Sequence, residues 1–130
     1  LEKAISEYMN KAISFYDTVG ESFYHGLILG LIATMDTQYK IKSNRESGNG
    51  RFDVCVLPES ILGTVVLIEC KHSISEDDLI DDAKEGASQI VEQKYLEEHK
   101  FKKYENAVGY GISFYKKQCY VVKVEQDPKM

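Results

Sequence analysis

The chain has 130 residues, of which 43% are hydrophobic and 28% are charged, and these proportions predict one globular domain with an ordinary core. Its formal net charge of −5 argues against a protein that coats nucleic acid through general positive charge. The longest apolar run, Gly26–Ala33, is too short to cross a bilayer, so we expect no membrane association.

Three cysteines occur in the chain, and none is part of a Cys-x-x-Cys pair. Because all of them fall in strand-like runs, we interpret Cys55, Cys70 and Cys119 as buried, reduced thiols rather than as a zinc site. Reduced thiols and the lack of a visible signal peptide predict a cytoplasmic location. The chain opens at Leu1 rather than at a methionine, so we expect a fragment that lacks a partner domain.

Two helices are predicted at the start of the chain. Apolar side chains recur at helical spacing over residues 1–16, which indicates an amphipathic helix. Residues 21–35 are apolar almost all round and predict a central, buried helix. Glu21 follows Thr18 at the spacing of a capping box, and His25 lies one turn later on the same face. Taken alone, each is a structural residue: a helix cap and a satisfied histidine.

Three strands follow, at residues 38–46, 51–57 and 64–71, with a tight turn at 47–50 and a proline-containing turn before the third strand. Side chains alternate along a strand, so Glu69 and Lys71 share one face. Pairing of the second and third strands could bring Asp53 to the same end of the sheet. Charged side chains are rarely buried unless they are paired or bound to metal, so this grouping requires a reason.

A helix is predicted from Ser75 to about Glu98, because acidic residues after a serine favour a helix start. Residues 76–82 carry five acids, which we interpret as a solvated face. Small residues at 86–88 would allow close packing on a sheet. Gln89 lies at the edge of the apolar stripe, where a surface role and a site role are equally compatible with the pattern.

Two further strands are predicted at residues 106–114 and 118–124. Gly109 and Gly111 in the first of them indicate a bulge or a close backbone approach. The predicted order is therefore helix, three strands, helix and two strands, after an additional N-terminal helix.

The charged group on the second and third strands has the chemistry of a magnesium site. Mg²⁺ is held by one or two carboxylates together with waters and substrate phosphates. Asp53 and Glu69 supply such carboxylates, and the main-chain carbonyl of Cys70 could add an oxygen. Lys71 would then lie beside the activated water, where it could orient or deprotonate this water or neutralise charge on a phosphate. The spacing does not distinguish one metal ion from two.

Asp53, a spacer and Glu69-Cys70-Lys71 resemble the motif of the PD-(D/E)XK nuclease superfamily. Glu21 corresponds to the acid on that family's first core helix, and Gln89 resembles its glutamine motif. The proline of the family name is absent, since Phe52 precedes Asp53. Three segments are similar to a bacterial branch of this superfamily whose nuclease-like domain follows an AAA-type ATPase-like domain: ESFYHGLILGL, SNRESGNGRFD and VLIECK.

The resemblance covers about residues 20–124 and implies an α/β fold. It predicts a restriction-endonuclease-like core (αβββαβ) in which helices flank a central mixed β-sheet, with an extra N-terminal helix. The implied division is an amphipathic helix or linker at 1–19, the nuclease-like domain at 20–124 and a tail at 125–130.

The implied activity is that of a deoxyribonuclease that depends on Mg²⁺ or Mn²⁺. DNA affinity could come from the missing ATPase-like domain, and a homodimer is compatible with the resemblance. The catalytic set would be Glu21, Asp53, Glu69, Lys71 and Gln89; the metal set would be Asp53, Glu69, Cys70 and Glu21; the nucleic-acid contacts would be Arg51, His25 and Arg45.

Several alternatives remain open at the level of sequence. The domain could be a catalytically inactive interaction or sensor module on the same fold. An α/β domain that binds a small nucleotide is a weaker alternative, because no glycine-rich phosphate loop is present. Arg51 could pair with an acid instead of a phosphate. Lys40, Lys42 and Arg45 could follow a nucleic-acid backbone, but solvated strand residues are the interpretation that the sequence favours.

Overall fold

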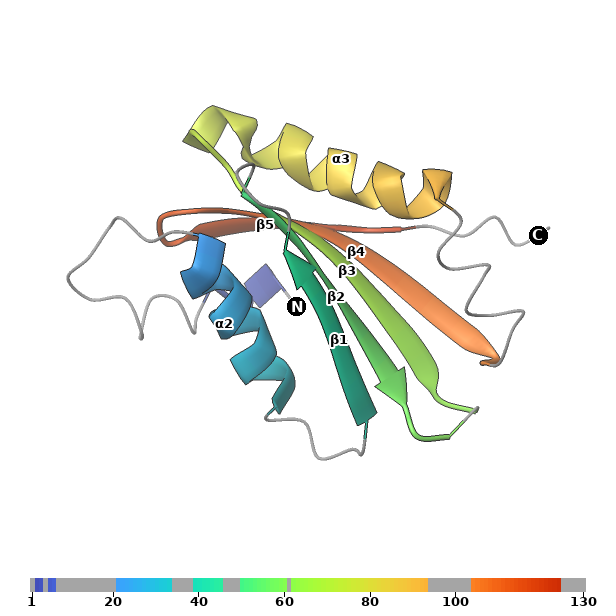
Figure 1. Ribbon diagram of the computed structural model, residues 1–130. Helices are drawn as coiled ribbons and strands as arrows, with labels where there is room; N and C mark the ends of the chain where they lie inside the picture. Colours follow the sequence, from blue (N-terminus) through green and yellow to red (C-terminus); the bar gives the residue numbers. More distant parts are fainter. Residues whose placement is uncertain are drawn as a thin grey trace.

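The computed structural model describes residues 2–3, 5–6, 21–33, 39–45, 50–60, 62–93 and 104–124. These residues form a five-stranded sheet with one helix on each face, as Figure 1 shows. The predicted α/β class is therefore confirmed. None of the helices in these ranges is both long and apolar enough to span a membrane.

The sheet has the order β1-β2-β3-β4-β5. The strands are β1 (Tyr39–Arg45), β2 (Arg51–Pro58), β3 (Thr64–His72), β4 (Asn106–Tyr115) and β5 (Gln118–Lys123). β3 and β4 are parallel, and the other neighbours are antiparallel. A parallel pair needs a crossover, which is made here by the 3₁₀-helix η1 (Glu76–Asp78) and the helix α3 (Leu79–Glu92). The described part of α3 ends at Glu92.

Helix α2 (Glu21–Ala33) covers one face of the sheet. Its side chains Tyr24, Leu27, Ile28 and Ile32 are buried against a cluster from the sheet: Phe52, Val54, Val56, Ile68, Cys70, Ile112 and Phe114. The sequence predicted a central, buried helix, and the four side chains named above are buried, whereas Gly26 and Gly30 are exposed.

Helix α3 covers the opposite face and packs mainly on β4, β3 and β5. Ala87 and Ile90 are buried together with Val65 and Leu67. The Ser113 hydroxyl of β4 donates a hydrogen bond to the Leu79 carbonyl in the first turn of α3. The alternation of each strand thus divides its side chains between two cores, one under each helix.

Two glycines bring α3 close to the sheet. A Cβ on Gly111 would overlap the Ala83 carbonyl oxygen and the Ala87 amide nitrogen, and a Cβ on Gly86 would come within 3.1 Å of the Glu69 carbonyl oxygen. Gly111 therefore marks a close backbone approach, which was one of the two predictions for this glycine pair. The contact fixes α3 directly above Glu69 and Gly111, which are register partners.

Some predictions fall outside the residues described. Of the predicted helix at 1–16, only Glu2, Lys3, Ile5 and Ser6 are described, and all are helical. The predicted tail at 125–130 and the last turns of the helix predicted from Ser75 to about Glu98, beyond Gln93, also lie outside. The boundary at residue 20 remains a prediction.

Candidate active site

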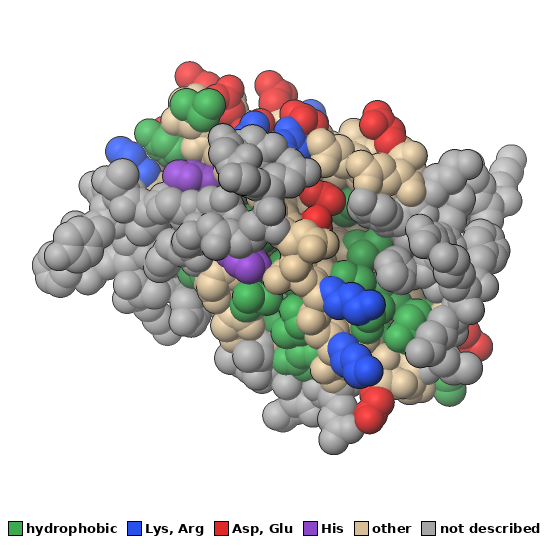
Figure 2. All heavy atoms as spheres, viewed as in Figure 1, with side chains coloured by type: hydrophobic (Ala, Val, Ile, Leu, Met, Phe, Trp, Pro, Cys, Tyr) green, Lys and Arg blue, Asp and Glu red, His purple; other side chains and the backbone are tan. Residues whose placement is uncertain are grey.

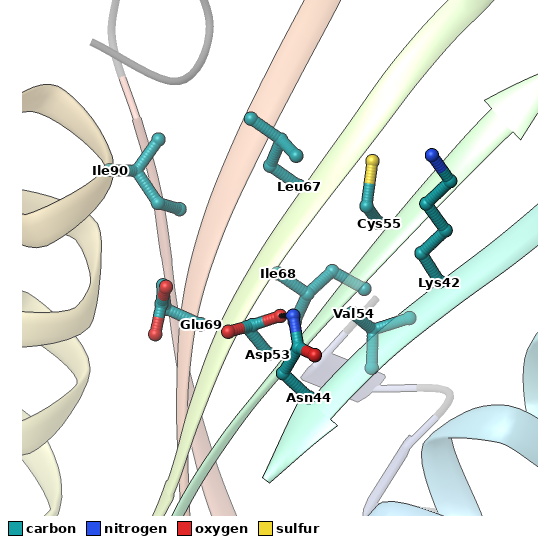
Figure 3. A pocket seen from close by; sticks show the side chains of 9 residues that line it. All are labelled: Lys42, Asn44, Asp53, Val54, Cys55, Leu67, Ile68, Glu69 and Ile90. Carbon is teal, nitrogen blue, oxygen red and sulfur yellow. Dashed lines mark hydrogen bonds between the residues drawn. The ribbon is translucent and has the colours of Figure 1, made fainter. Parts of the chain in front are cut away.

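Two carboxylates face each other across adjacent strands. Asp53 of β2 and Glu69 of β3 are register partners, and side chains directly opposite in a sheet project to the same face. Figure 3 shows both carboxylates in the space bounded by α3 and β1. Both residues are half-buried. The sequence predicted that the two would share one end of the sheet, and the register brings them side by side.

The carboxylates line a pocket of about 230 Å³. Ile90 of α3 forms one wall, and Lys42 and Asn44 of β1 form the other (Figure 3). The Asn44 side-chain Nδ2 donates to Asp53 Oδ1 at 3.4 Å. Asn44 did not figure among the site residues expected from the sequence, because its place opposite Asp53 depends on the register of an edge strand.

The negative charge of the two carboxylates raises the pKa of neighbouring cysteine thiols. Burial raises the pKa of the Cys70 thiol well above its usual range, and the carboxylates of Glu69 and Asp53 raise it further. Burial also raises the pKa of Cys55, which the charge of Lys42 opposes and that of Asp53 reinforces. A site with this potential favours a cation.

Cys70 contributes no side chain to this face. Its thiol is 2% exposed and belongs to the core beneath α2. The candidate metal ligand from Cys70 is therefore its main-chain carbonyl oxygen, as the sequence analysis suggested.

Lys71 follows Glu69 on the same face and is held by helix α3. Its Nζ lies 3.8 Å from Asp82 Oδ1, and the two side chains are 21% and 13% exposed. The other carboxylate oxygen of Asp82 accepts a hydrogen bond of 2.6 Å from the Ser73 hydroxyl. Ser73 is itself buried, and its amide donates to the Phe114 carbonyl at 2.7 Å. The Lys71 ammonium is therefore directed toward α3 by an anchored carboxylate.

Arg51 makes a second ion pair with α3. It is the register partner of Lys71, and its Nη2 contacts Oε1 of Glu85. The alternative of an ion pair for Arg51 is thus found, with Glu85 as the partner. The Arg51 side chain is 14% exposed and that of Glu85 is 51% exposed, so the pair lies at the rim of the site.

Gln89 lies on the same side of α3 as Asp82 and Glu85, because residues four and seven apart share a helix face. It is half-buried, but it is not among the residues that line the Asp53–Glu69 pocket. The α3 side chain that contacts the Lys71 ammonium is Asp82. A role of Gln89 in orienting Lys71 remains a prediction.

Glu21 and His25 belong to α2, on the other face of the sheet. Glu21 begins this helix, and its side chain lies outside the described residues. The His25 ring packs against Phe52 with ring centroids 5.1 Å apart, and Phe52 points away from the Asp53 face. His25 Nε2 is buried and finds no hydrogen-bond partner among the residues that the structure describes. Arg45 ends β1 opposite Phe52, and its side chain is likewise not described.

The donor set fits a hard divalent cation that other ligands complete. Within the described ranges, no group of three or more His, Cys, Asp or Glu side chains is arranged to hold a metal ion. Mg²⁺ does not require such a group, since one or two carboxylates with waters and substrate phosphates are its usual protein ligands. Asp53 and Glu69 match this requirement.

Sequence reasoning missed Asp82 and Glu85. Asp82 was counted with the solvated acids at the start of the predicted helix, and Glu85 was not considered, although Gln89 had been singled out on the same helix. Their spacing with Gln89 is the available signal, since positions 82, 85 and 89 form one stripe. The sequence could not show that this stripe faces Lys71 and Arg51.

A family model described as the PD-(D/E)XK nuclease superfamily matches residues 19–124 of the chain. No curated protein matches the chain. The matched range contains every element from α2 to β5. The fold is therefore restriction-endonuclease-like, as the sequence predicted.

Proposed function

The chain belongs to the PD-(D/E)XK nuclease superfamily, and from this premise we propose that the Asp53–Glu69 pair is the centre of a metal-dependent deoxyribonuclease. The family implies a nuclease and a nucleic-acid substrate. DNA as that substrate, Mg²⁺ or Mn²⁺ as the cofactor and the roles of individual residues are our proposals.

One observation carries the proposal. Asp53 and Glu69 are direct partners across β2 and β3 in a pocket of about 230 Å³, and Lys71 follows two residues later on the same face. Two carboxylates that share a face repel each other when both are ionised. Their close placement is explained if they bind a cation between them.

The proposed chemistry is in-line hydrolysis of a phosphodiester. A bound Mg²⁺ or Mn²⁺ would lower the pKa of a water molecule and polarise the phosphoryl oxygen. A water oxygen forms the new bond to phosphorus, the ester P–O bond breaks on the opposite side, and the leaving oxygen takes a proton. Lys71 would orient the attacking water or stabilise charge on the phosphate.

The remaining residues have supporting roles in this proposal. Asp53, Glu69 and the Cys70 carbonyl would hold the cation, and Glu21 would assist directly or through a water. Gln89 would orient Lys71 or the water. Arg51, His25 and Arg45 would contact nucleic acid, which for Arg51 means an exchange of Glu85 for a phosphate.

A catalytically inactive interaction or sensor domain is the second candidate. The observation that favours it is that Lys71 and Arg51 both face carboxylates of α3, Asp82 and Glu85. A lysine and an arginine that are used in such pairs could be purely structural. The attachment to an ATPase-like domain, a bacterial origin, a cytoplasmic location and a homodimer accompany either candidate as proposals.

Calorimetric titration with Mn²⁺ separates the two candidates. The wild type is compared with Asp53→Asn/Glu69→Gln, which keeps the side-chain shapes but removes both charges. The matched control is Asp77→Asn/Asp81→Asn, which removes two charges from exposed positions outside the pocket.

We expect Mn²⁺ binding by the wild type and the control, no binding by the pocket variant, and cleavage of labelled DNA only by the two proteins that bind. Equal Mn²⁺ binding by all three proteins, or binding by none, contradicts the metal site. Binding at the pocket without cleavage of DNA or RNA supports the interaction domain instead.

A further inference from the structure

Strand β1 presents a polar row on the same face as the carboxylate pair. Its residues Lys40, Lys42 and Asn44 are the register partners of Leu57, Cys55 and Asp53, and direct partners project to the same face. Two contacts agree with the register. Asn44 donates to Asp53, and Lys42 lines the pocket together with Asp53, Glu69 and Cys55, as Figure 3 shows.

The two lysines of this row are accessible. Both Lys40 and Lys42 are exposed, and β1 is an edge strand of the sheet. In the described part of the chain, neither ammonium takes part in an ion pair. Their charges are therefore available to a ligand that reaches the pocket over β1.

The helical segment on the other side of the pocket, beyond the Ile90 wall, is rich in acids. Exposed acids lie along η1 and α3: Glu76, Asp77, Asp78, Asp81 and Glu85. Figure 2 shows acidic side chains along the edge of the molecule above α3 and basic side chains on the front of the sheet. Two cations on the α3 side already face carboxylates, since Arg51 contacts Glu85 and Lys71 contacts Asp82, and Lys84 is the exposed lysine of α3 itself. A polyanion is thus attracted over β1 and repelled over α3.

We propose that a single nucleic-acid strand lies lengthwise along the exposed face of β1, with Lys42 and then Lys40 contacting phosphates next to the phosphate held at Asp53 and Glu69. This inference rests on the proposed nuclease function and names its substrate class. The substrate is an unpaired strand, because the second strand of a duplex that spans the pocket would face the acids of η1 and α3.

The geometry of a strand suits this role. Side chains on one face of a β-strand repeat every two residues, about 6.6 Å apart. The row Asn44, Lys42 and Lys40 therefore leads away from Asp53 in even steps that are short enough for neighbouring phosphates. Lysine binds phosphate as a compact charge on a flexible stem, which makes contacts to the backbone without reading its bases. This inference takes up the alternative that the sequence left open, in which Lys40 and Lys42 follow a nucleic-acid backbone.

The test compares Lys40→Gln/Lys42→Gln with Lys84→Gln/Lys123→Gln. Both variants lose two exposed lysines, and the control pair lies on α3 and β5. Fluorescence anisotropy gives the Kd for a labelled single-stranded oligonucleotide across a range of salt concentrations, and cleavage in Mn²⁺ gives kcat and KM. Thermal melts confirm that both variants fold, since exposed substitutions change stability little.

For the β1 variant we expect a Kd raised about tenfold and a slope of log K against log salt reduced by about 1.4, because each phosphate contact on a single strand contributes about 0.7. The KM for cleavage should rise about tenfold, which corresponds to about 1.4 kcal/mol of lost binding. The control should retain the wild-type Kd and slope. Wild type should prefer the single strand to a blunt duplex of the same sequence.

The outcomes separate this inference from the proposed function. Cleavage by the wild type with an unchanged Kd in the β1 variant overturns the strand placement alone. Equal affinity for single strand and blunt duplex overturns the substrate class. Binding with the expected salt dependence but without cleavage supports the placement and contradicts hydrolysis. A wild type that binds no oligonucleotide overturns both.

Discussion

The Lys71 ammonium and the Asp82 carboxylate, 3.8 Å apart, join the third strand of the sheet to the helix that covers it. Asp82 is held in turn by the hydroxyl of Ser73, which is buried at the end of β3. Lys71, which we assign to catalysis, is therefore positioned by Asp82, a residue outside the Glu69-Cys70-Lys71 motif. Its position depends on where α3 lies on the sheet.

Asp82→Asn should slow cleavage on the order of tenfold, since about 1.4 kcal/mol of lost positioning corresponds to that factor. The asparagine oxygen can still accept from Ser73, but it carries no charge to hold the Lys71 ammonium. Mn²⁺ affinity, measured by calorimetry, should not change. Asp81→Asn is the control, because Asp81 is the exposed neighbour with the same charge. Wild-type cleavage by Asp82→Asn would show that the ion pair is not needed.

The carboxylate pair should destabilise the protein until a cation binds. Like charges directly opposite in a sheet repel, so Asp53→Asn/Glu69→Gln should melt at the same temperature as metal-free wild type or higher. Mn²⁺ at about 100 times its Kd should stabilise wild type by about 2.7 kcal/mol and leave the variant unchanged. Calorimetric melts with and without Mn²⁺ measure both effects. A large loss of stability in the metal-free variant would mean that the two acids are structural.

Gly111→Ala should displace α3 and lower the free energy of unfolding. The new methyl group would overlap backbone atoms of Ala83 and Ala87, and overpacking of this kind costs about 1–3 kcal/mol. Gly30→Ala is the matched control, because no atom lies within 4 Å of its Cβ position in α2. This control should gain about 0.5–1 kcal/mol through helix propensity. Urea unfolding compares the two, and equal stability would contradict the close approach of α3.

Tyr24 should make stability fall at high pH. Burial raises the pKa of its phenol to about 12, so the unfolded chain ionises from about pH 10 while the folded protein still holds the proton. The stabilising contribution is complete below pH 10 and is lost as the pH rises to 12, by at most about 2.7 kcal/mol.

Tyr24→Phe removes this dependence along with the hydrogen bond to the Lys116 carbonyl. Near pH 8 the variant should be less stable than wild type by about 1 kcal/mol. Denaturant unfolding at several pH values should show this difference shrink, and then reverse sign, between pH 10 and 12. A difference that stays constant across that range would contradict the raised pKa.

The strand pattern was predictable because period-2 alternation determines which side chains share a face. It indicated that Asp53 and Glu69 could share one end of the sheet, because Asp53 lies near the start of one strand and Glu69 near the end of the next. The helix contacts were not predictable in this way. Asp82 belongs to a run of acids whose simplest interpretation is solvation, and Glu85 lies after that run without a motif of its own. Only the rotation of α3 on the sheet turns these two carboxylates toward Lys71 and Arg51.

The two faces of the sheet account for the other differences. Glu21 and His25 were joined to the site by resemblance, but their helix α2 packs on the face that carries Phe52 and Cys70. Lys40 and Lys42 were interpreted as solvated strand residues, because lysines on a strand are most simply explained by solvation. Their alignment with Asp53 follows from the register of β1 with β2, which lies beyond the reach of local sequence.

The parallel pairing of β3 with β4 has a consequence for the order in which the site assembles. β2 and β3 are joined by a short connection, whereas Glu69 meets its β4 partner Gly111 only after the chain has closed a long crossover. Closing a longer loop costs more entropy, and distant pairings form more slowly. During folding, Asp53 and Glu69 should therefore come together early, when β2 pairs with β3. The Lys71–Asp82 contact should form later, when α3 packs on the sheet.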